Sequence, residues 1–375
     1  MATTMRPMLL GDVVRFGNGR AIKPGGEGRY PVYGSNGIIG GCDEFRYENG
    51  VIIGRVGAYC GSVLYCSEKF WASDNTLVAF PANDEFDTKF LFYLLHDTKL
   101  SNYAGGAAQP LVTQTVLKQV KVSVPPLPVQ RRIAGILSAY DELMENSQRR
   151  IRLLEAMARA LYREWFVHFR FPGHEKHPRV ASPLGDILQG CEVKKLKDVC
   201  RLTMGQSPKS KFYNETGEGQ PFHQGVTDFG DRFPTDRLFC TVEGRIAEAG
   251  DILFSVRAPV GRMNIADKRI IIGRGLSAIR HNHGHQAFLW EQLRNRFTED
   301  DMMGNGAIFA AVTKDDMQGI ELVCPPSPLV VAATKHFEPI HSELGALTKQ
   351  IQNLRRTRDL LLPRLLSGQI SILIN

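Results

Sequence analysis

The sequence predicts an α+β protein with two α/β domains in tandem repeat, joined by two long antiparallel coiled-coil helices. Three observations support this fold class. The chain matches itself after a shift of 200 residues, so that Pro125–Pro126 fall on Pro325–Pro326. A heptad pattern of apolar residues follows each double proline. Dense Gly-rich turns separate short runs of β-forming residues before each double proline, as expected of many short strands.

The internal repeat continues through most of the chain. The positions that match at this shift are Gly50–Ile53 with Gly250–Leu253, Val56 with Val256, Ala58 with Ala258, Gly61 with Gly261, Gly106–Ala107 with Gly306–Ala307, Thr113 with Thr313, and Ile151, Leu154 and Leu161 with Ile351, Leu354 and Leu361. Near the start the shift is 186, because Leu10–Val13 resembles Leu196–Val199. The second copy therefore carries about 14 more residues in its first third. A period this long indicates two domains and not a solenoid.

Each copy contains short strands, one medium helix and a final strand. The expected strands include Val51–Ile53, Ser62–Tyr65 and Arg269–Ile272, and the expected helices are Thr88–Leu100 and Gln286–Phe297. The final strands, Val120–Val124 and Ile320–Val323, stop at the double prolines because proline cannot donate to a strand ladder.

The long helices are predicted from apolar residues that alternate steps of three and four, which is the seam of a coiled coil. The first seam is Leu137, Tyr140, Met144, Ser147, Ile151, Leu154, Ala158, Leu161 and Trp165. The second is Phe337, Ile340, Leu344, Leu347, Ile351, Leu354, Arg358, Leu361 and Leu365. The polar members Ser147 and Arg358 can fix the register of the pair. Pro363 should kink the second helix or begin a new turn.

These patterns divide the chain into five segments. The expected segments are a first domain at 1–127, a first long helix at 128–171, a linker at 172–190, a second domain at 191–327 and a second long helix at 328–369. The linker is polar and is broken by Pro172 and Pro178, so it should be the exit turn from the first helix.

Composition is that of an ordinary globular protein, with a net charge of +7 and a pI of about 9.0. A basic balance permits a polyanionic partner such as DNA without requiring one. The seven cysteines form no C-x-x-C pair, which favours free thiols in a reducing compartment over disulfides or zinc. The sequence shows neither a signal peptide nor a long apolar run, so we expect a soluble cytoplasmic protein.

Several known catalytic motifs are absent from the sequence. It contains no phosphate-binding G-x-x-x-x-G-K-[ST] loop and no Asn-Pro-Pro-aromatic methyltransferase motif. His281, His283 and His285 are expected on an exposed loop, since a metal would need further ligands nearby. Glu192 and Lys194 match only the E-x-K half of a nuclease site, so they do not indicate a nuclease. A chain of this size without a catalytic motif is more typical of a binding protein or scaffold.

Several segments resemble one protein family. Val124–Ser138 with Asp141–Leu143 resembles the central region of type I restriction–modification specificity subunits, and Leu161–Phe166 is similar to the end of that region's helix. Leu361–Gly368 resembles the end of the family's second helix. The motifs that resemble its target-recognition domains are Tyr30–Gly34, Gly37–Gly40 and Met204–Pro208. One departure is that Pro328–Val331 lacks the Gln-Arg-Arg sequence present at Gln130–Arg132.

The resemblance implies a non-catalytic DNA-recognition subunit that reads a split, asymmetric site, one half per domain. It also implies two adenine-specific methyltransferase subunits that use S-adenosylmethionine, and restriction subunits that use ATP and Mg²⁺, with no cofactor in this chain. Two alternatives stay open from the residues alone. One is a tandem-domain scaffold that binds a protein or glycan, and the other is an enzyme with an unrecognised site.

Candidate DNA contacts are polar residues expected on loops, because base edges are read by Arg, Lys, Asn, Gln, Ser and Thr, and phosphates by Lys and Arg. They are Tyr33, Ser35, Asn36, Arg55, Gln109 and Thr113 in the first domain, and Lys209, Lys211, Tyr213, Gln224, Arg257 and Thr313 in the second. The helix arginines Arg149, Arg150, Arg152, Arg355 and Arg356 could be a solvated face or could face DNA. Trp165, Phe166 and Phe169 could pack internally or contact a partner.

Overall fold

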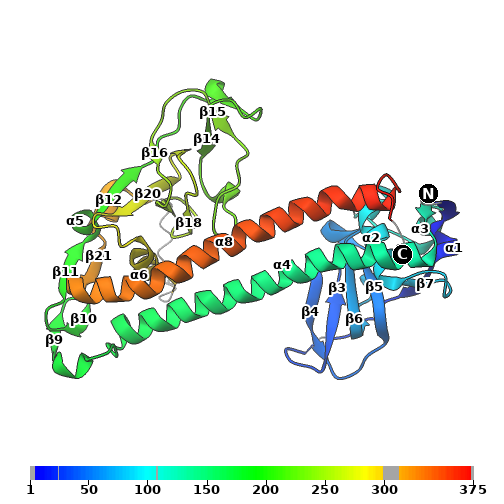
Figure 1. The fold of residues 1–375 in the computed structure, drawn as a ribbon, viewed down its shortest axis with the longest axis horizontal. Coiled ribbons are helices and arrows are strands. Elements are labelled where there is room, and N and C mark those ends of the chain that lie inside the picture. The colour runs from blue at the N-terminus through cyan, green and yellow to red at the C-terminus, as the bar shows by residue number, and fades with distance from the viewer. Residues whose placement is uncertain (1–4, 24, 107–108, 299–311, 373–375) are drawn as a thin grey trace. The chain divides into compact units, whose positions relative to one another are not determined.

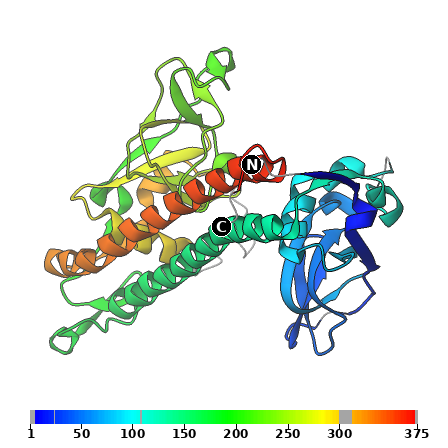
Figure 2. The ribbon, with the colours of Figure 1, turned by 45° about the vertical axis from the view of Figure 1, so that its right-hand side comes forward.

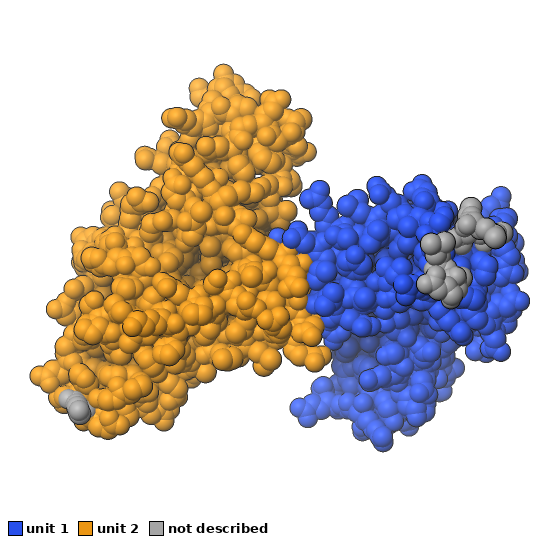
Figure 3. All heavy atoms as spheres, in the orientation of Figure 1, with its two compact units in different colours: residues 1–145, 352–375 blue, residues 146–351 orange. Residues whose placement is uncertain are grey.

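The computed structural model describes residues 5–23, 25–106, 109–298 and 312–372. It divides into two compact units, one formed by residues 1–145 with 352–375 and the other by residues 146–351 (Figure 3). Each unit contains one mixed α/β domain and a part of each long helix. The long helices are α4 (Leu127–Tyr162) and α8 (Ser327–Leu366).

The first unit is built on a six-stranded sheet in the order β2-β7-β5-β6-β3-β4. Its strands are β2 (Val14–Asn18), β3 (Tyr30–Gly34), β4 (Gly37–Cys42), β5 (Tyr47–Gly54), β6 (Val63–Ala72) and β7 (Thr76–Pro81), and a separate pair joins β1 (Arg6–Leu9) to β8 (Lys121–Val124). Its short helices are α1 (Leu10–Val13), α2 (Thr88–Asp97) and α3 (Gln114–Lys118). Along β5, Val51 and Ile53 enter the core shared with α2 and α4, while Ile52 faces the opposite cluster, as strand alternation requires.

The second unit has two main sheets where the first has one. The four-stranded sheet is β12 (Cys200–Met204), β20 (Leu276–His281), β17 (Ile252–Ser255) and β18 (Met263–Ile265); the five-stranded sheet is β13 (Tyr213–Asn214), β15 (Phe239–Cys240), β14 (Gln220–His223), β19 (Ile270–Ile272) and β16 (Ile246–Ala247). The remaining elements are β9 (Arg179–Ser182), β10 (Gly185–Leu188), β11 (Glu192–Lys195), β21 (Glu321–Cys324), α5 (Leu196–Val199), α6 (Gln286–Thr298) and α7 (Lys314–Gly319).

The structure repeats as the sequence does. β7 and β20, β8 and β21, and the starts of α4 and α8 are each 200 residues apart, while β1 and β11 and β2 and β12 are 186 apart. One strand corrects the ungapped alignment. Val51 pairs with Ala79, whereas Ile252 pairs with Ile279, so Ile252 and not Asp251 is the counterpart of Val51.

The predicted coiled coil is confirmed within each unit, where α4 and α8 run side by side (Figures 1 and 2). In the second unit Arg150 bonds Glu343, and Trp165 lies edge-on to His336, so the two chain directions are opposed. In the first unit Leu137 shares a core with Leu365. The predicted seam residues are all buried or half-buried, as expected of a packed seam.

Three boundary predictions differ from the structure. The α-helical part of α4 ends at Tyr162, and a π-helical turn (Arg163–Val167) precedes Phe169, whose left-handed φ of 57° stops the helix. The predicted linker contains the β9–β10 hairpin. Of the two outcomes predicted at Pro363, the new turn is wrong, because α8 continues to Leu366, and the kink stays a prediction; Pro363 lies exposed in the last turn, so it removes a hydrogen bond only there.

Candidate nucleic-acid interface

Three loops of the first domain meet where β3 and β5 end and β7 begins. The Ser35 hydroxyl donates to the carbonyl oxygen of Asn75 at 2.8 Å, and the Arg55 backbone N–H donates to the same oxygen at 2.9 Å. The Val112 N–H donates to the carbonyl oxygen of Arg55 at 3.0 Å. We call Ser35, Arg55, Asn75 and Val112 the first loop cluster. It brings three predicted contacts, Ser35, Arg55 and Thr113, onto adjoining loops.

The second domain has the same arrangement where β14 and β17 end and β20 begins. The Gly275 N–H donates to the carbonyl oxygen of Gln224 at 3.0 Å, and the Val256 N–H donates to that of Gly275 at 3.0 Å. The Val312 N–H donates to the carbonyl oxygen of Val256 at 2.8 Å. We call Gln224, Val256, Gly275 and Val312 the second loop cluster. The predicted contacts Arg257 and Thr313 each follow a member of it.

Some predicted contacts around the loop clusters are open to solvent. Asn36, Gln109, Gln224 and Arg257 are exposed, and they offer the amide and guanidinium groups that bind base edges. Arg55 is half-buried, and its Nε has no hydrogen-bond partner among the residues that the structure describes. A base contact by these side chains stays a prediction.

Two predicted contacts are aromatic residues that pack within their domains. The Tyr33 ring meets Phe70 edge-on, with centroids 5.7 Å apart, and burial raises the pKa of Tyr33 far above its usual value. The Tyr213 ring stacks on Phe222 at 4.6 Å, and its hydroxyl donates to the carbonyl oxygen of Pro208 at 2.7 Å. Burial also raises the pKa of Tyr213. Packing on Phe70 and Phe222 therefore explains the positions of both rings, and a base contact by either residue stays a prediction.

Basic residues gather on the segment before β13. Lys209 and Lys211 are exposed, as expected of phosphate contacts, and the Lys211 ammonium lies 5.0 Å from the Phe212 ring centre. Arg274 is also exposed, and its backbone N–H donates to the Ser207 hydroxyl at 3.1 Å. Arg274 was not among the predicted contacts, and it directly precedes Gly275 of the second loop cluster. The matching residue in the first copy is Asp74, so the repeat gave no signal for it.

Thr113 and Thr313 cap the helices α3 and α7. The Val116 N–H donates to the Thr113 hydroxyl at 3.3 Å, and the Asp316 N–H donates to the Thr313 hydroxyl at 3.2 Å. The Thr313 hydroxyl donates in turn to the Asp316 carboxylate, which lowers the pKa of Asp316. Helix capping is sufficient to explain the hydrogen bonds of both hydroxyls, and a contact of either residue with DNA stays a prediction.

The His-Asn-His-Gly-His segment begins at His281, which is the half-buried last residue of β20 and so does not lie on the predicted exposed loop. Nδ1 of His281 accepts the backbone N–H groups of His283 and His285, at 3.1 and 3.4 Å. Burial and the neighbouring histidines lower the pKa of His281 to about 4. Because its Nδ1 accepts these two backbone N–H groups, the His281 side chain stabilises the loop. Across the described residues, no group of three His, Cys, Asp or Glu side chains could hold a metal ion.

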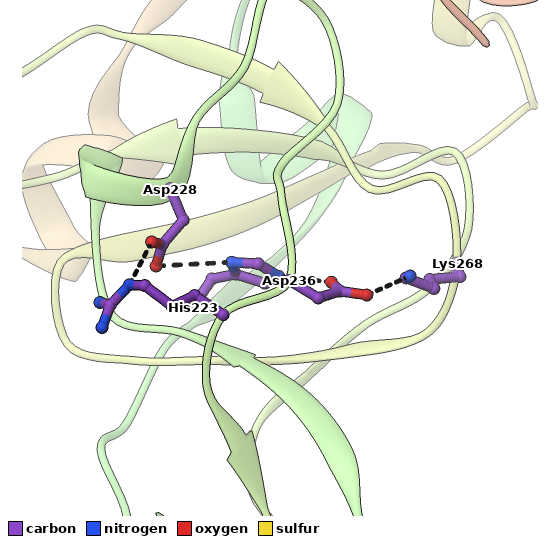
Figure 4. A network of polar contacts seen from close by, with 5 residues as sticks. His223, Asp228, Asp236 and Lys268 are labelled. Atoms are coloured by element: carbon purple, nitrogen blue, oxygen red, sulfur yellow. Dashed lines mark hydrogen bonds and ion pairs between the residues drawn. The ribbon is translucent and has the colours of Figure 1, made fainter. Parts of the chain in front are cut away.

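A polar network lies beside Gln224 in the second domain (Figure 4). Nε2 of the fully buried His223 donates to Asp236 at 3.2 Å, and Asp236 also pairs with Lys268. Asp228 lies 3.9 Å from Nδ1 of His223 and accepts from Arg237 at 3.0 Å. Burial lowers the pKa of His223, against the opposing effect of the two carboxylates. The network ties the segment after Gln224 to the end of β14.

A polar joint fastens the first domain to both long helices. The Tyr93 hydroxyl of α2 donates to Asp141 of α4 at 2.6 Å, and Arg358 of α8 donates to the same carboxylate at 2.6 Å. Burial and the Asp141 carboxylate raise the pKa of Tyr93. The joint explains the polar seam residue Arg358, whose partner could not be identified from sequence.

The second domain has a more deeply buried joint. His341 of α8 accepts from Arg232 at Nδ1, 2.9 Å away, and donates from Nε2 to Glu291 of α6 at 2.8 Å. The Arg232 guanidinium also lies 5.7 Å from the Trp290 ring centre. Burial lowers the pKa of Arg232 to about 10 and also lowers that of His341. A neutral histidine thus bridges a buried cation and a buried anion.

The two helix starts differ as their sequences do. Gln130 is fully buried, and its side-chain amide donates to the carbonyl oxygens of Glu85 and Pro125 and accepts the Asp87 N–H at 3.0 Å. The counterpart Val330 is buried in an apolar cluster with Phe288. The start of α4 is therefore held by a buried polar side chain, Gln130, whereas the start of α8, which lacks the Gln-Arg-Arg sequence, is held by apolar packing of Val330.

The remaining helix residues divide between surface and packing. All five helix arginines, Arg149, Arg150, Arg152, Arg355 and Arg356, are exposed, and whether they face DNA stays a prediction. Trp165 and Phe166 pack against the apolar cluster around Phe337, and the Phe166 ring meets Phe288 at 5.0 Å. The Arg179 guanidinium lies over the Phe169 ring at 5.4 Å. All seven cysteines are free, as predicted. Within the described ranges, no helix has the length and apolarity to cross a membrane.

Comparison with known proteins decides the family. A family model described as the type I restriction modification DNA specificity domain matches residues 4–156 and 189–353. The chain belongs to this family. The putative type I restriction enzyme MjaX specificity subunit of Methanocaldococcus jannaschii is 32% identical over 370 residues, 96% of this chain and 84% of that relative. The MjaIX specificity subunit of the same organism is 24% identical over 315 residues, covering 76% and 69% of the two chains.

A solved structure shares the fold. The crystal structure of a type I restriction-modification system S subunit from M. genitalium matches with a TM-score of 0.70 at 18% identity, covering 97% of this chain and 96% of that one. The chain is thus a specificity subunit with two DNA specificity domains, and the predicted family and fold class are confirmed. The alternative of a scaffold for a protein or glycan is set aside.

Proposed function

We propose that this specificity subunit reads a split, asymmetric DNA site, with one half-site bound by each domain. The observation that carries the proposal is the recurrence of one loop arrangement. In each domain three loops meet at the ends of equivalent strands, and exposed polar side chains project beside them. Rigid strands that hold polar loops suit base reading, and two copies suit two half-sites.

The catalytic steps are assigned to partner subunits. We propose that two methyltransferase subunits and the restriction subunits dock on this chain and supply S-adenosylmethionine, ATP and Mg²⁺ chemistry, and that the assembly works in the cytoplasm. Leu153 and Met157 of α4 are 59% and 58% exposed and lie one helical turn apart. Exposed apolar side chains on one helix face support a protein contact there.

Mapping of methylated bases in cells that carry this chain with its methyltransferase tests the proposed function. The expected result is one motif with two specified halves and an unspecified spacer. A continuous motif, or methylation that is independent of sequence, would contradict it. In vitro, affinity of the complex for the site should fall steeply with salt, because phosphate contacts release counterions.

Spacer length is proposed to depend on the length of α4 and α8. One heptad added to each helix lengthens it by about 10.5 Å, which corresponds to about 3 base pairs. The variant should methylate sites with a spacer longer by that amount. An unchanged spacer preference would refute this part of the proposal.

A further inference from the structure

The second domain replaces a tight turn with a long loop. In the first domain β3 and β4 are joined by Ser35–Asn36, because Gly34 pairs with Gly37. In the second domain the matching hairpin is β14–β15, in which Gln220 pairs with Cys240, and residues 224–238 connect the strands. Most of the extra length of the second copy lies in this connection, which we call the long loop.

The tip of the long loop contacts α8. Arg232 is 7% exposed and donates to both Nδ1 and the carbonyl oxygen of His341, at 2.9 and 3.3 Å. The Phe233 ring packs one turn further along, next to Gly345, and Lys349 lies 5.5 Å from its centre. His341, Gly345 and Lys349 are spaced by four, so they share one face of the helix.

The base of the long loop contacts the second loop cluster. His223 holds Asp236 at 3.2 Å and directly precedes Gln224, whose carbonyl oxygen accepts from Gly275. The carbonyl oxygen of His223 accepts from Gly273 at 2.8 Å. The hydrogen bond of Asn264 to Gly230, at 2.8 Å, braces the middle of the loop. A continuous set of contacts therefore runs from α8 to the residues beside Gln224.

We propose that the long loop is a positioning element that holds the base-contacting loops of the second domain on α8, and that Arg232 and Phe233 are its positioning residues. This inference rests on the proposed function. It assigns sequence discrimination in one half-site to residues that need not touch DNA. Displacing the loop tip from α8 loosens the reading of that half-site and leaves the other half unchanged.

Gly345 provides a matched pair of test variants. A Cβ at this position would lie 3.5 Å from the Phe233 ring, which is ordinary van der Waals contact, so Gly345→Ala fits and favours the helix. Gly345→Leu places further atoms where the Phe233 ring lies and pushes the loop tip away, without weakening α8 and without changing any charged residue. Arg232→Lys is a second variant, which keeps the cation but loses the planar guanidinium whose Nη2 donates to both His341 acceptors.

The experiment measures methylation of a DNA library randomised in both half-sites, with each variant in its full complex. Gly345→Leu is expected to lower base preference in one half-site on the order of tenfold, comparable to one lost base contact. Arg232→Lys should act in the same half, and Gly345→Ala should match the parent protein. A merely structural defect would lower methylation of every sequence equally.

Two results overturn the inference. One is unchanged preference in Gly345→Leu and Arg232→Lys, and the other is an equal loss in both halves. If the parent complex itself shows no base preference, the proposed function fails and the inference falls with it. If the parent complex and the variants show the same base preference, the positioning role of the long loop is rejected and the proposed function stands.

Discussion

The two domains share a scaffold and differ in how one hairpin is closed. β2 pairs with β7 and β1 with β8 in the first copy, as β12 pairs with β20 and β11 with β21 in the second. The β3–β4 connection is a tight turn, whereas the β14–β15 connection is a long loop whose tip packs on α8. The strands that support the loop clusters therefore match in the two copies, whereas the loops differ.

The attachment of each domain to the long helices differs as well. The first domain is fastened by Gln130 and by the joint of Tyr93 with Asp141. The second is fastened by Arg232, His341 and Glu291, which are more deeply buried. Asp141 and His341 are 200 residues apart, so one position of the repeat serves both joints, with a carboxylate in the first and a neutral imidazole in the second.

Removal of the buried cation should have the largest effect on stability. Arg232→Met leaves Glu291 buried without its countercharge and is expected to cost about 3–5 kcal/mol. Arg358→Met breaks the half-exposed pair with Asp141 and should cost about 1.5–3 kcal/mol. Denaturant unfolding measures both. Equal costs would mean that burial does not distinguish the two joints.

Removal of the Gln130 amide should have the next largest effect on stability. Gln130→Leu leaves the Asp87 N–H and two carbonyl oxygens buried without partners and should cost about 2–3 kcal/mol. Its counterpart change, Val330→Ala, deletes two methyl groups and should cost about 1–2 kcal/mol. A negligible cost for Gln130→Leu, measured by thermal unfolding, would show that water replaces the amide.

Acid should affect the second unit first. Among the described residues, the histidines with a lowered pKa are His223, His281 and His341, and all lie in residues 146–351. In the unfolded chain they bind protons near pH 6.5, whereas in the folded unit they stay neutral. Stability is therefore lost as the pH falls from about 6.5 toward 4. Hydrogen exchange should rise in peptides from this unit before those of the first, and a uniform rise would contradict the assignment.

The helix caps should give the smallest effect and separate capping from DNA contact. Thr113→Ala and Thr313→Ala are each expected to cost about 1 kcal/mol. Thr113→Asp keeps the cap but adds a negative charge. If Thr113 touches DNA, the aspartate variant should lose affinity while keeping its thermal stability. Unchanged affinity in Thr113→Asp would remove this residue from the predicted interface.

Periodic burial made much of the fold predictable. Leu137, Ile151 and Leu354 follow heptad spacing because each must reach the seam, and the double prolines mark where strands stop and helices start. The long loop could not be predicted, since residues 224–238 carry no period and owe their course to contacts with α8. The partner of Arg358 lies 217 positions away in the sequence, and only the fold brings Asp141 to it. The sequence predicts Tyr33 and Tyr213 as base contacts, and only the fold shows that their rings also pack on Phe70 and Phe222.

Exchange of one domain tests most directly whether each domain reads one half-site. Residues 191–327 would be replaced by the matching segment of a relative that methylates a different sequence, and methylated sites would be mapped in cells. One half of the motif should change to that of the relative, while the other half and the spacer stay as they were. A change in both halves, or in neither, would contradict one half-site per domain.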